Sequence, residues 1–438
     1  MSSNQKFRVQ PGGKLQGKIR VAGDKSISHR SIMLGALAEG TTHVEGFLEG
    51  EDALATLKAF RAMGVEIEGP ENGRVVVHGV GMNGLQEPAA ELDLGNAGTG
   101  MRLMCGLMAG QGLEITLIGD ESLSKRPMKR VTTPLADMGA EINSTPKGTA
   151  PLVIRPVDGL RGIEYDMPVA SAQVKSCLLL AGMYANGDTC VIEPAPTRDH
   201  TERMLRGFGY DVRTEGNRIC LTGGGKLTAC DIDVPADISS AAFFLVGASI
   251  APDSDLTLEH VGMNPTRDGV ITILRLMGAD IEVSNERVVG GEPVADLRVR
   301  TAKLKGIRIP EDQVPLAIDE FPALFIAAAC AEGETVLTGA EELRVKESDR
   351  IQAMADGLEA LGVDAQATPD GIIIQGGKIG GGSVDSHGDH RIAMSFAIAA
   401  LRAEGEIHID DCANVNTSFP GFVDLASGVG LSIEAEND

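Results

Sequence analysis

The sequence predicts a mixed α/β fold with two domains, each made of three copies of one structural repeat. Two patterns support this prediction: an amphipathic helix that ends in glycine and runs into a strand, and a second helix that is apolar on all sides. Each pattern occurs six times along the chain. The length of 438 residues is the third observation, since it has room for about two to four domains of ordinary size.

The first pattern is marked by a glycine at the end of each amphipathic helix. These glycines follow one another at intervals of 75, 70, 69, 84 and 68 residues. Glycine suits this place because a helix often ends in a left-handed residue. The six copies span 57–68, 131–142, 201–212, 273–283, 353–365 and 424–434, with the glycines Gly64, Gly139, Gly209, Gly278, Gly362 and Gly430.

The second pattern is rich in small and apolar residues all round, which is typical of a helix buried in a core. Each copy closes on a glycine and a strand. One buried and one amphipathic helix with several strands make a repeat too small to fold alone, so we expect three repeats to share each domain. The six copies span 31–46, 99–119, 171–193, 239–261, 321–339 and 390–409.

Composition excludes several classes of partner. The formal net charge of -23, an aromatic content of 3 % and the absence of Trp argue against nucleic acid, which needs a basic surface and stacking side chains. The apolar run 241–251 is too short to span a bilayer. Residues 1–13 have neither the apolar core of a secretory signal nor the character of a transit peptide. We therefore expect a cytoplasmic protein with no membrane partner.

The seven cysteines occur singly, with no C-x-x-C pair and no His at metal-ligand spacing. Free Cys behaves as a small hydrophobe. We therefore expect all seven to be reduced core residues, and no metal site.

The stretches that precede the six apolar helices all carry Ser, Thr, Asn or Asp, and helix capping alone would explain each of them. Capping does not explain cations in the first turns, where they oppose the helix dipole. A bound anion would explain these cations, because helix N-termini bind phosphate and carboxylate and the cations would then face the anion. We therefore expect a small, highly anionic ligand. The stretches are 23–30, 94–102, 169–175, 235–240, 317–322 and 387–391, and the cations are Lys25, Arg30, Arg102, Lys175 and Arg391.

Two further stretches concentrate charge. Residues 122–130 hold four cations, and residues 342–350 interleave acidic and basic side chains. The second stretch could be a solvated helix with internal ion pairs. Its place between a strand pattern at 334–340 and a helix pattern at 351–363 favours a functional connection instead.

Eight motifs, taken in order, resemble those of the enolpyruvyl transferases, and among them the 5-enolpyruvylshikimate-3-phosphate synthase family. The resemblance covers almost the whole chain. The motifs are GDKSISHR at 23–30, LGNAGTGMR at 94–102, GDESLSKRP at 119–127, ASAQVKS at 170–176, TRDHTE at 197–202, AIDEFP at 317–322, RVKESDR at 344–350 and DHRIAM at 389–394.

The resemblance implies a two-domain inside-out α/β barrel with six βαβαββ repeats, three per domain. One domain would comprise 1–23 and 240–438, the other 24–239, with the active site in the cleft between them. The implied reaction transfers the carboxyvinyl group of phosphoenolpyruvate to the 5-hydroxyl of shikimate 3-phosphate and releases phosphate. It implies no metal or organic cofactor, and we expect a monomer.

This addition and elimination needs a base, an acid and cationic support. By the resemblance, Asp319 is the base for the 5-hydroxyl, with Lys25 beside it, and Glu347 is the acid at the methylene carbon. The residues alone leave open which carboxylate acts as acid or base in each step. Asp319 could also be a plain N-cap of the following apolar helix. His29 and His390 are interpreted as structural neighbours.

The same resemblance assigns substrate contacts. Arginine suits them because its planar fork grips carboxylate and phosphate with two hydrogen bonds. The expected contacts of shikimate 3-phosphate are Lys25, Ser26, Arg30, Ser171, Ala172, Gln173, Arg198, Asp319 and Lys346. The expected contacts of phosphoenolpyruvate are Lys25, Asn96, Gly98, Arg126, Gln173, Arg350 and Arg391.

Some positions depart from the family pattern. Ala172 replaces a serine found in some members, so only its backbone N–H can serve the phosphate, and Arg198 is expected to supply the missing contact. Residues 416–419 read NTSF, without the Lys that many members place there, which suggests a divergent branch of the family. Gly98 stands where glyphosate-insensitive members can carry Ala, so we expect glyphosate to enter the site.

Two other functions share features with this sequence. The sister transferase that acts on UDP-N-acetylglucosamine typically has a Cys in the loop that corresponds to 119–127, and this chain has none there. A non-catalytic anion-binding scaffold would have no use for buried carboxylates, whereas this chain keeps both Asp319 and Glu347.

Overall fold

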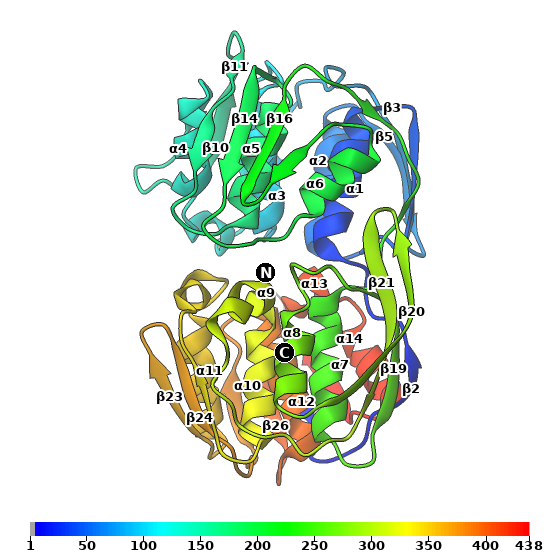
Figure 1. Ribbon diagram of the computed structural model, residues 1–438, viewed down its shortest axis with the longest axis vertical. Coiled ribbons are helices and arrows are strands. Elements are labelled where there is room, and N and C mark those ends of the chain that lie inside the picture. The colour runs from blue at the N-terminus through cyan, green and yellow to red at the C-terminus, as the bar shows by residue number, and fades with distance from the viewer. Residues whose placement is uncertain (1–4, 438) are drawn as a thin grey trace. The chain divides into compact units, whose positions relative to one another are not determined.

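The two recurring helices of the sequence correspond to two kinds of helix in the computed structural model, which describes residues 5–437 (Figure 1). The apolar pattern forms six helices in which almost every residue is buried, as expected. They are α1 (Lys25–Leu37), α3 (Gly98–Ala109), α5 (Ala172–Gly182), α7 (Ile238–Ile250), α10 (Phe321–Cys330) and α12 (His390–Ala399).

The amphipathic pattern forms the second set of helices. Each ends shortly before its marker glycine, and all six glycines have positive φ, between 81° and 124°. The expectation of a left-handed residue at each helix end is therefore confirmed. The helices are α2 (Glu51–Ala62), α4 (Lys129–Asp137), α6 (His200–Gly207), α8 (Gly269–Leu276), α11 (Arg350–Ala360) and α14 (Phe422–Val429).

The chain divides into two compact units. Of the described residues, one unit holds those from 5 to 22, Pro235–Val288 and those from 292 to 437, and the other holds Gly23–Val234 with Val289–Gly291. The division falls at 22/23 and 234/235, where the sequence placed it at 23/24 and 239/240. We call the first unit 1 and the second unit 2.

Unit 2 has three four-stranded sheets, each with one parallel pair followed by two antiparallel pairs. The first runs β18 (Ile232–Asp233), β4 (Thr41–Glu45), β6 (Arg74–His78), β5 (Glu66–Glu71). The second runs β7 (Leu92–Asp93), β8 (Ile115–Ile118), β10 (Leu152–Arg155), β9 (Glu141–Asn143). The third runs β12 (Glu164–Asp166), β14 (Asp188–Ile192), β16 (Arg218–Thr222), β15 (Arg213–Glu215).

Short parallel pairs link neighbouring repeats of unit 2. They are β17 (Leu227–Thr228) with β3 (Ala38–Glu39), and β11 (Leu160–Arg161) with β13 (Ala185–Asn186). Because β17 and β18 come from the end of the unit and β3 and β4 from its beginning, these pairings close the three repeats on themselves.

Unit 1 has two four-stranded sheets and one three-stranded sheet, in which both pairs are antiparallel. One sheet runs β25 (Gly382–Asp385), β26 (Ile407–Asp410), β1 (Gln5–Val9), β27 (Ile433–Asn437). Another runs β2 (Gln16–Ile19), β19 (Asp255–Gly262), β21 (Glu292–Arg300), β20 (Asp280–Val289), and the third β22 (Glu334–Leu337), β24 (Gly371–Gln375), β23 (Asp364–Thr368). Helices α7, α10 and α12 pack against one another inside the unit, with the sheets outside (Figure 1).

Each unit has a core of its own. The core of unit 2 is made of residues between Ile27 and Val234, and the core of unit 1 of residues up to Val21 and from Ala236 onwards. Strand β1 joins the first residues of unit 1 to its last ones, since Phe7 lies opposite both Ile409 and Ala435.

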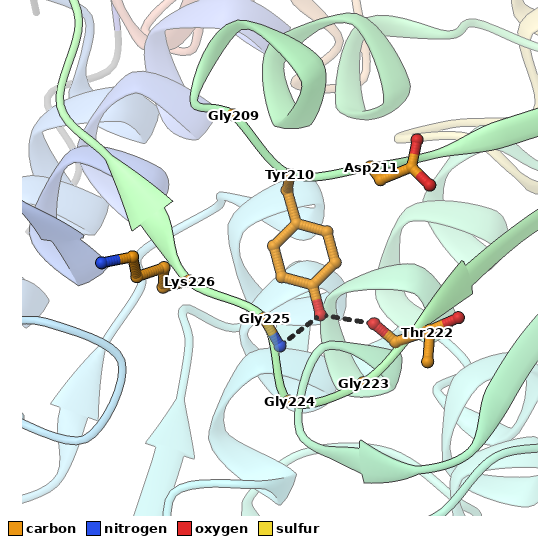
Figure 2. Close-up of a pocket in the computed structure, with 8 residues that line it drawn as sticks. All are labelled: Gly209, Tyr210, Asp211, Thr222, Gly223, Gly224, Gly225 and Lys226. Carbon is orange, nitrogen blue, oxygen red and sulfur yellow. Dashed lines mark hydrogen bonds between the residues drawn. The ribbon is translucent and has the colours of Figure 1, made fainter.

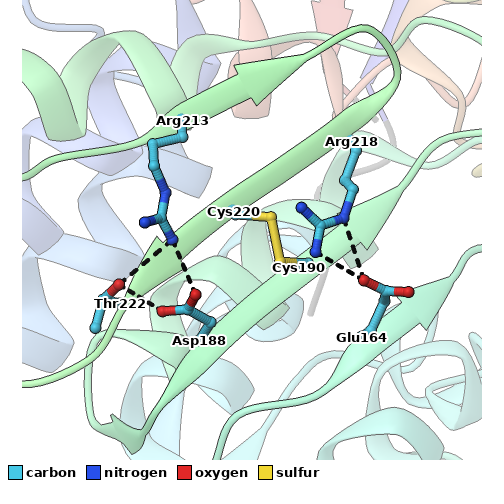
Figure 3. Close-up of a disulfide and its surroundings, with 7 residues drawn as sticks. All are labelled: Glu164, Asp188, Cys190, Arg213, Arg218, Cys220 and Thr222. Carbon is cyan, nitrogen blue, oxygen red and sulfur yellow. Dashed lines mark hydrogen bonds and ion pairs between the residues drawn. A yellow bond between two sulfur atoms is a disulfide. The ribbon is translucent and has the colours of Figure 1, made fainter.

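The cysteine prediction was wrong for two residues. Cys190 on β14 and Cys220 on β16 form a disulfide, flanked by the ion pairs Arg213–Asp188 and Arg218–Glu164 (Figure 3). The two cysteines are 30 residues apart in sequence and are brought face to face by the antiparallel register of these strands. Of the other five, Cys105, Cys177 and Cys412 are buried as expected, while Cys230 and Cys330 are partly exposed.

Among residues 5–437, one apolar stretch is long enough to cross a membrane, Glu311–Cys330, and two thirds of its most apolar 18-residue window is buried within the protein. It is the run of short helices η2 (Glu311–Gln313), α9 (Val314–Ala317) and η3 (Ile318–Glu320) that leads into α10. A stretch that is buried to this extent is typical of a helix in a protein core.

Candidate active site

The expected site residues fall into two groups, one on each unit. In unit 2, Lys25 begins helix α1, which Asp24 caps by accepting a hydrogen bond from the Ile27 N–H at 2.8 Å. The Lys25 ammonium donates to Asp52 Oδ2 at 3.1 Å. Asp52 is buried in the first turn of α2. Sequence reasoning missed it, because an acid in the first turn of a helix reads as an ordinary dipole partner.

Arg126 and its neighbours form the second part of this group. The Arg126 guanidinium donates to Asn96 Oδ1 at 2.6 Å, and the Asn96 amide donates in turn to Asp120 Oδ2 at 2.8 Å. Gly98 lies against the same guanidinium, since a Cβ added there would be 2.7 Å from Arg126 Nη1. The three expected phosphoenolpyruvate contacts Asn96, Gly98 and Arg126 are thus brought together.

Helix α3 begins here without a side-chain cap, while Ser171 caps α5 by accepting from the Val174 N–H at 3.3 Å. The Gln173 side chain joins the two helix ends. It accepts from Arg102 Nη1 at 2.7 Å and donates to Thr99 Oγ1 at 3.0 Å. The structure therefore links Gln173 to Arg102, one of the cations that the sequence analysis expects near a bound anion.

Arg30 lies deeper than its expected role as a substrate contact suggests, with 4 % of its surface exposed. Its guanidinium donates to Thr201 Oγ1 at 2.7 Å, to Ser176 Oγ at 3.0 Å and to the Ser26 carbonyl at 2.8 Å. These bonds fix its orientation between α1, α5 and α6.

The expectation that Lys175 faces a bound anion was wrong. Its ammonium is buried and forms salt bridges to Glu193 at 2.8 Å and to Glu202 at 3.0 Å. Burial raises the pKa of Glu202, and Lys175 opposes this shift. The negative charge expected beside Lys175 therefore comes from Glu193 and Glu202 and not from a bound anion.

His29 is a structural neighbour, as interpreted from the sequence. Its Nδ1 shares a hydrogen bond with Thr56 Oγ1 at 2.8 Å. Burial, assisted by the charges of Lys25 and Arg30, lowers the pKa of His29 to about 3. The ring is therefore neutral at physiological pH.

In unit 1, all five expected residues are joined. Asp319 lies in η3, and its Oδ1 is 3.3 Å from Arg350 Nη1 and 3.7 Å from Lys346 Nζ. Arg391, in the first turn of α12, donates to the Asp319 carbonyl at 3.2 Å. Asp319 is not a helix cap: the residue before α10 is Glu320, and no side chain caps that helix among the described residues.

Arg350 is the centre of this second group. Its side chain is 1 % exposed, and besides Asp319 it binds Glu347 Oε2 at 2.6 Å and Asp389 Oδ2 at 2.8 Å. Burial opposes its charge, but the three carboxylates more than compensate and hold the pKa of Arg350 above its ordinary value. The arrangement fixes one cation between two candidate proton-transfer groups.

Asp389 was missed in sequence because it was read as part of a capping motif. It does cap α12, accepting from the Arg391 N–H at 2.9 Å, but it is wholly buried and also accepts from Ser348 Oγ at 3.0 Å. Burial alone would raise the pKa of Asp389, yet Arg350 more than offsets it and the pKa lies below its ordinary value. Asp389 thus ties together the segments that carry Glu347, Arg350 and Arg391.

None of these residues lines the pocket of about 440 Å³ drawn in Figure 2. There the Tyr210 hydroxyl donates to the Thr222 carbonyl at 2.7 Å and accepts from the Gly225 N–H at 3.3 Å, so the ring closes a glycine-rich turn. One group could offer three metal ligands within the described part of the chain: Glu66, Glu68 and His78. Both glutamates are exposed, as acidic groups without a metal commonly are.

Comparison with known proteins decides the family. Residues 9–425 match the profile of EPSP synthase (3-phosphoshikimate 1-carboxyvinyltransferase). The chain belongs to the EPSP synthase family. Its relatives include the 3-phosphoshikimate 1-carboxyvinyltransferases of Methylococcus capsulatus, 71 % identical over 98 % of both chains, and of Alkalilimnicola ehrlichii, 70 % identical over 98 % of this chain and 96 % of that protein.

Solved structures agree with the EPSP synthase assignment. The EPSP synthase from Acinetobacter baumannii matches with a TM-score of 0.90 and 62 % identity, over 99 % of this chain and 100 % of that one. The enolpyruvyl transferase NikO from Streptomyces tendae matches in fold, with a TM-score of 0.80, 17 % identity and full coverage of both chains. The enolpyruvyl transferase fold expected from the sequence is confirmed.

Proposed function

We infer that the chain is a 3-phosphoshikimate 1-carboxyvinyltransferase, which transfers the enolpyruvyl group of phosphoenolpyruvate to the 5-hydroxyl of shikimate 3-phosphate and releases phosphate. This is a step of the shikimate pathway toward chorismate and the aromatic amino acids. Its relatives bear this name at 60 to 71 % identity. The UDP-N-acetylglucosamine reaction and the non-catalytic scaffold are not favoured.

We propose that Asp319 takes the proton of the 5-hydroxyl and that Glu347 protonates the methylene carbon. The observation that supports a role for both groups is the Arg350 guanidinium, which contacts both carboxylates, at 3.3 and 2.6 Å. Addition bonds the 5-oxygen to C2 of phosphoenolpyruvate and gives a tetrahedral intermediate that carries a methyl group. In the elimination, this methyl group returns one proton to Glu347 as the C–O bond to phosphate breaks, which restores the double bond.

Phosphoenolpyruvate carries a carboxylate and a phosphate, and the proposed contacts divide between the units. Lys25, Asn96, Gly98, Arg126 and Gln173 of unit 2 would act with Arg350 and Arg391 of unit 1. The positions of Arg126 and Arg350 are fixed by protein partners before any ligand binds. Fixed cations stabilise developing charge without the cost of reorganising.

For shikimate 3-phosphate we propose Ser26, Arg30, Ser171, the Ala172 N–H, Gln173 and Arg198 from unit 2, with Lys25 beside the reacting hydroxyl, and Asp319 and Lys346 from unit 1. Two observations support this proposal: Ser26 and Arg30 share a hydrogen bond, and Ser171 opens α5 next to Gln173. The helix end offers free N–H groups to an anion.

The test is phosphate release from purified protein given shikimate 3-phosphate and phosphoenolpyruvate, with UDP-N-acetylglucosamine as the control acceptor. We expect turnover with the first acceptor only. Asp319→Asn and Glu347→Gln should each lower kcat by about a hundredfold or more, the size expected for losing a general acid or base. A variant with near-normal kcat removes that residue from its proposed role.

We also propose that the protein acts in the cytoplasm as a monomer. Light scattering should give the mass of one chain at working concentration, and fractionation should place the activity with cytoplasmic enzymes. A dimer mass would overturn the monomer, and activity in the membrane fraction would overturn the location.

A further inference from the structure

A buried group of charges lies one helical turn from Ser171. Lys175 is 1 % exposed, and its ammonium contacts Glu193 Oε1 at 2.8 Å, Glu202 Oε2 at 3.0 Å and the Thr197 carbonyl at 3.5 Å. The three N–H donors of this ammonium are matched by three protein oxygens, which leaves none for a substrate. The proposed mechanism gives this cation no task.

The two glutamates lie at the two ends of one irregular segment. Glu193 follows strand β14, Glu202 lies in the first turn of α6, and residues 194–199 between them carry Arg198. The Thr197 hydroxyl also donates to Glu193. One ammonium group therefore holds the beginning, the middle and the end of the segment that presents Arg198.

Neighbouring hydrogen bonds connect this segment to the proposed phosphate contacts. The Lys175 N–H donates to the Ser171 carbonyl at 3.1 Å, so both residues share the first turns of α5. Thr201 Oγ1 donates to Ser176 Oγ at 2.7 Å and accepts from Arg30 Nε at 2.7 Å. The segment is thus attached to the helices that carry Ser171 and Arg30.

We propose that Lys175 is a positioning residue, which acts through Glu193, Glu202 and Thr197 to set the place of Arg198 for the phosphate of shikimate 3-phosphate. The inference rests on the proposed contact of Arg198. Removing the ammonium leaves two buried carboxylates without their cation, and such groups repel and draw in water. The segment then moves, and Arg198 moves with it.

A double-mutant cycle between Lys175→Met and Arg198→Ala tests this. We expect Lys175→Met to raise the KM for shikimate 3-phosphate about tenfold and the KM for phosphoenolpyruvate less than twofold. In the Arg198→Ala background the same change should have no further effect. Lys226→Met, which removes an exposed lysine paired with Glu39 in the same unit, is the matched control and should leave both KM values unchanged.

Two isosteric variants serve if Lys175→Met does not fold. Glu193→Gln and Glu202→Gln each remove one negative partner of the same ammonium, but only Glu193 also binds Thr197. We expect both variants to raise the KM for shikimate 3-phosphate, and the KM of Glu193→Gln to be at least three times that of Glu202→Gln. Lys175→Arg should restore most of the affinity lost in Lys175→Met.

Three results would overturn the inference: independent effects of Lys175→Met and Arg198→Ala, equal increases in both KM values, or equal effects of the two glutamine variants. An unchanged KM in Arg198→Ala alone would also overturn it, and would leave the proposed reaction standing if wild-type protein still releases phosphate. Absence of phosphate release from wild-type protein would instead refute the proposed function.

Discussion

At the scale of single residues, Gly98 decides how close the backbone of α3 lies to Arg126. A methyl group at this place would be 2.7 Å from Arg126 Nη1 and 3.4 Å from Arg102 Nη1. Both atoms are at the far ends of flexible side chains. An alanine is therefore accommodated by a shift of the guanidinium rather than by unfolding.

We predict that Gly98→Ala raises the KM for phosphoenolpyruvate several-fold, because Arg126 must leave its place. Glyphosate, which should inhibit the wild-type protein by competing with phosphoenolpyruvate, should lose more affinity than the substrate. Initial rates at varied phosphoenolpyruvate and glyphosate measure both. Unchanged inhibition in the variant would contradict the proposed site, and the KM for shikimate 3-phosphate serves as the internal control.

His29 gives a prediction on stability. Its pKa is about 3 in the folded protein and about 6.5 when unfolded, so only the unfolded state binds a proton between these values. The contribution of the neutral His29 ring to the stability of the fold is fully present above pH 6.5 and is lost as the pH falls toward 3. When the pH is lowered from 7.5 to 5, protonation of His29 in the unfolded state should lower the free energy of unfolding by about 2 kcal/mol.

His29→Gln should abolish that part of the pH dependence, while the exposed His43→Gln should leave it as in the wild type. Urea unfolding at pH 7.5 and 5 measures the difference. Equal loss of stability in the wild type and the His29 variant would show that the buried ring does titrate in the folded state.

At the scale of elements, the marker glycines explain how each repeat turns from helix to strand. Gly209 has φ of +81°, and a methyl group added to it would have only the Thr228 hydroxyl nearby, at 4.0 Å, so backbone conformation and not space requires glycine there. Gly207, two residues earlier at the end of α6, would have no atom within 4 Å of such a methyl group and has no positive φ.

We predict opposite effects for these neighbours. Gly209→Ala should lower the unfolding free energy by about 1–2 kcal/mol, the cost of a left-handed alanine. Gly207→Ala should leave it unchanged or raise it by up to about 1 kcal/mol, since alanine favours the helix. Equal effects in thermal or urea unfolding would contradict the proposed role of positive φ.

The sequence predicted that capping residues stand at the helix ends, but not which other side chains those residues contact. Four of the six buried helices have a side-chain cap, through Asp24, Ser171, Asp237 and Asp389. The sequence could not tell that Asp389 also binds Arg350, because that contact joins residues 39 apart. Local patterns specify caps, whereas ion pairs between helices depend on how the helices pack.

At the scale of the whole molecule, the two hydrophobic cores share no residue. The core of unit 2 comes entirely from one continuous stretch of chain, and the strands β17 and β18 near its end pair with β3 and β4 near its beginning. A fragment with these properties has what a domain needs to fold by itself.

We predict that residues 23–234, expressed alone, fold and unfold in a single cooperative urea transition. The same fragment with Leu178→Asp, a charge placed in its core, is the control that should not fold. Noncooperative unfolding of the unmodified fragment would show that unit 2 depends on the rest of the chain.

The sequence by itself determined the sixfold repeat, the buried helices, the left-handed glycines and the family. Each of these features follows from a local periodicity or from a motif that is contiguous in the chain. Only the tertiary structure decided which charges meet: that Lys175 binds Glu193 and Glu202, that Arg350 joins three carboxylates, and that Cys190 faces Cys220. These partners are distant in sequence, and only strand register and helix packing bring them within bonding distance.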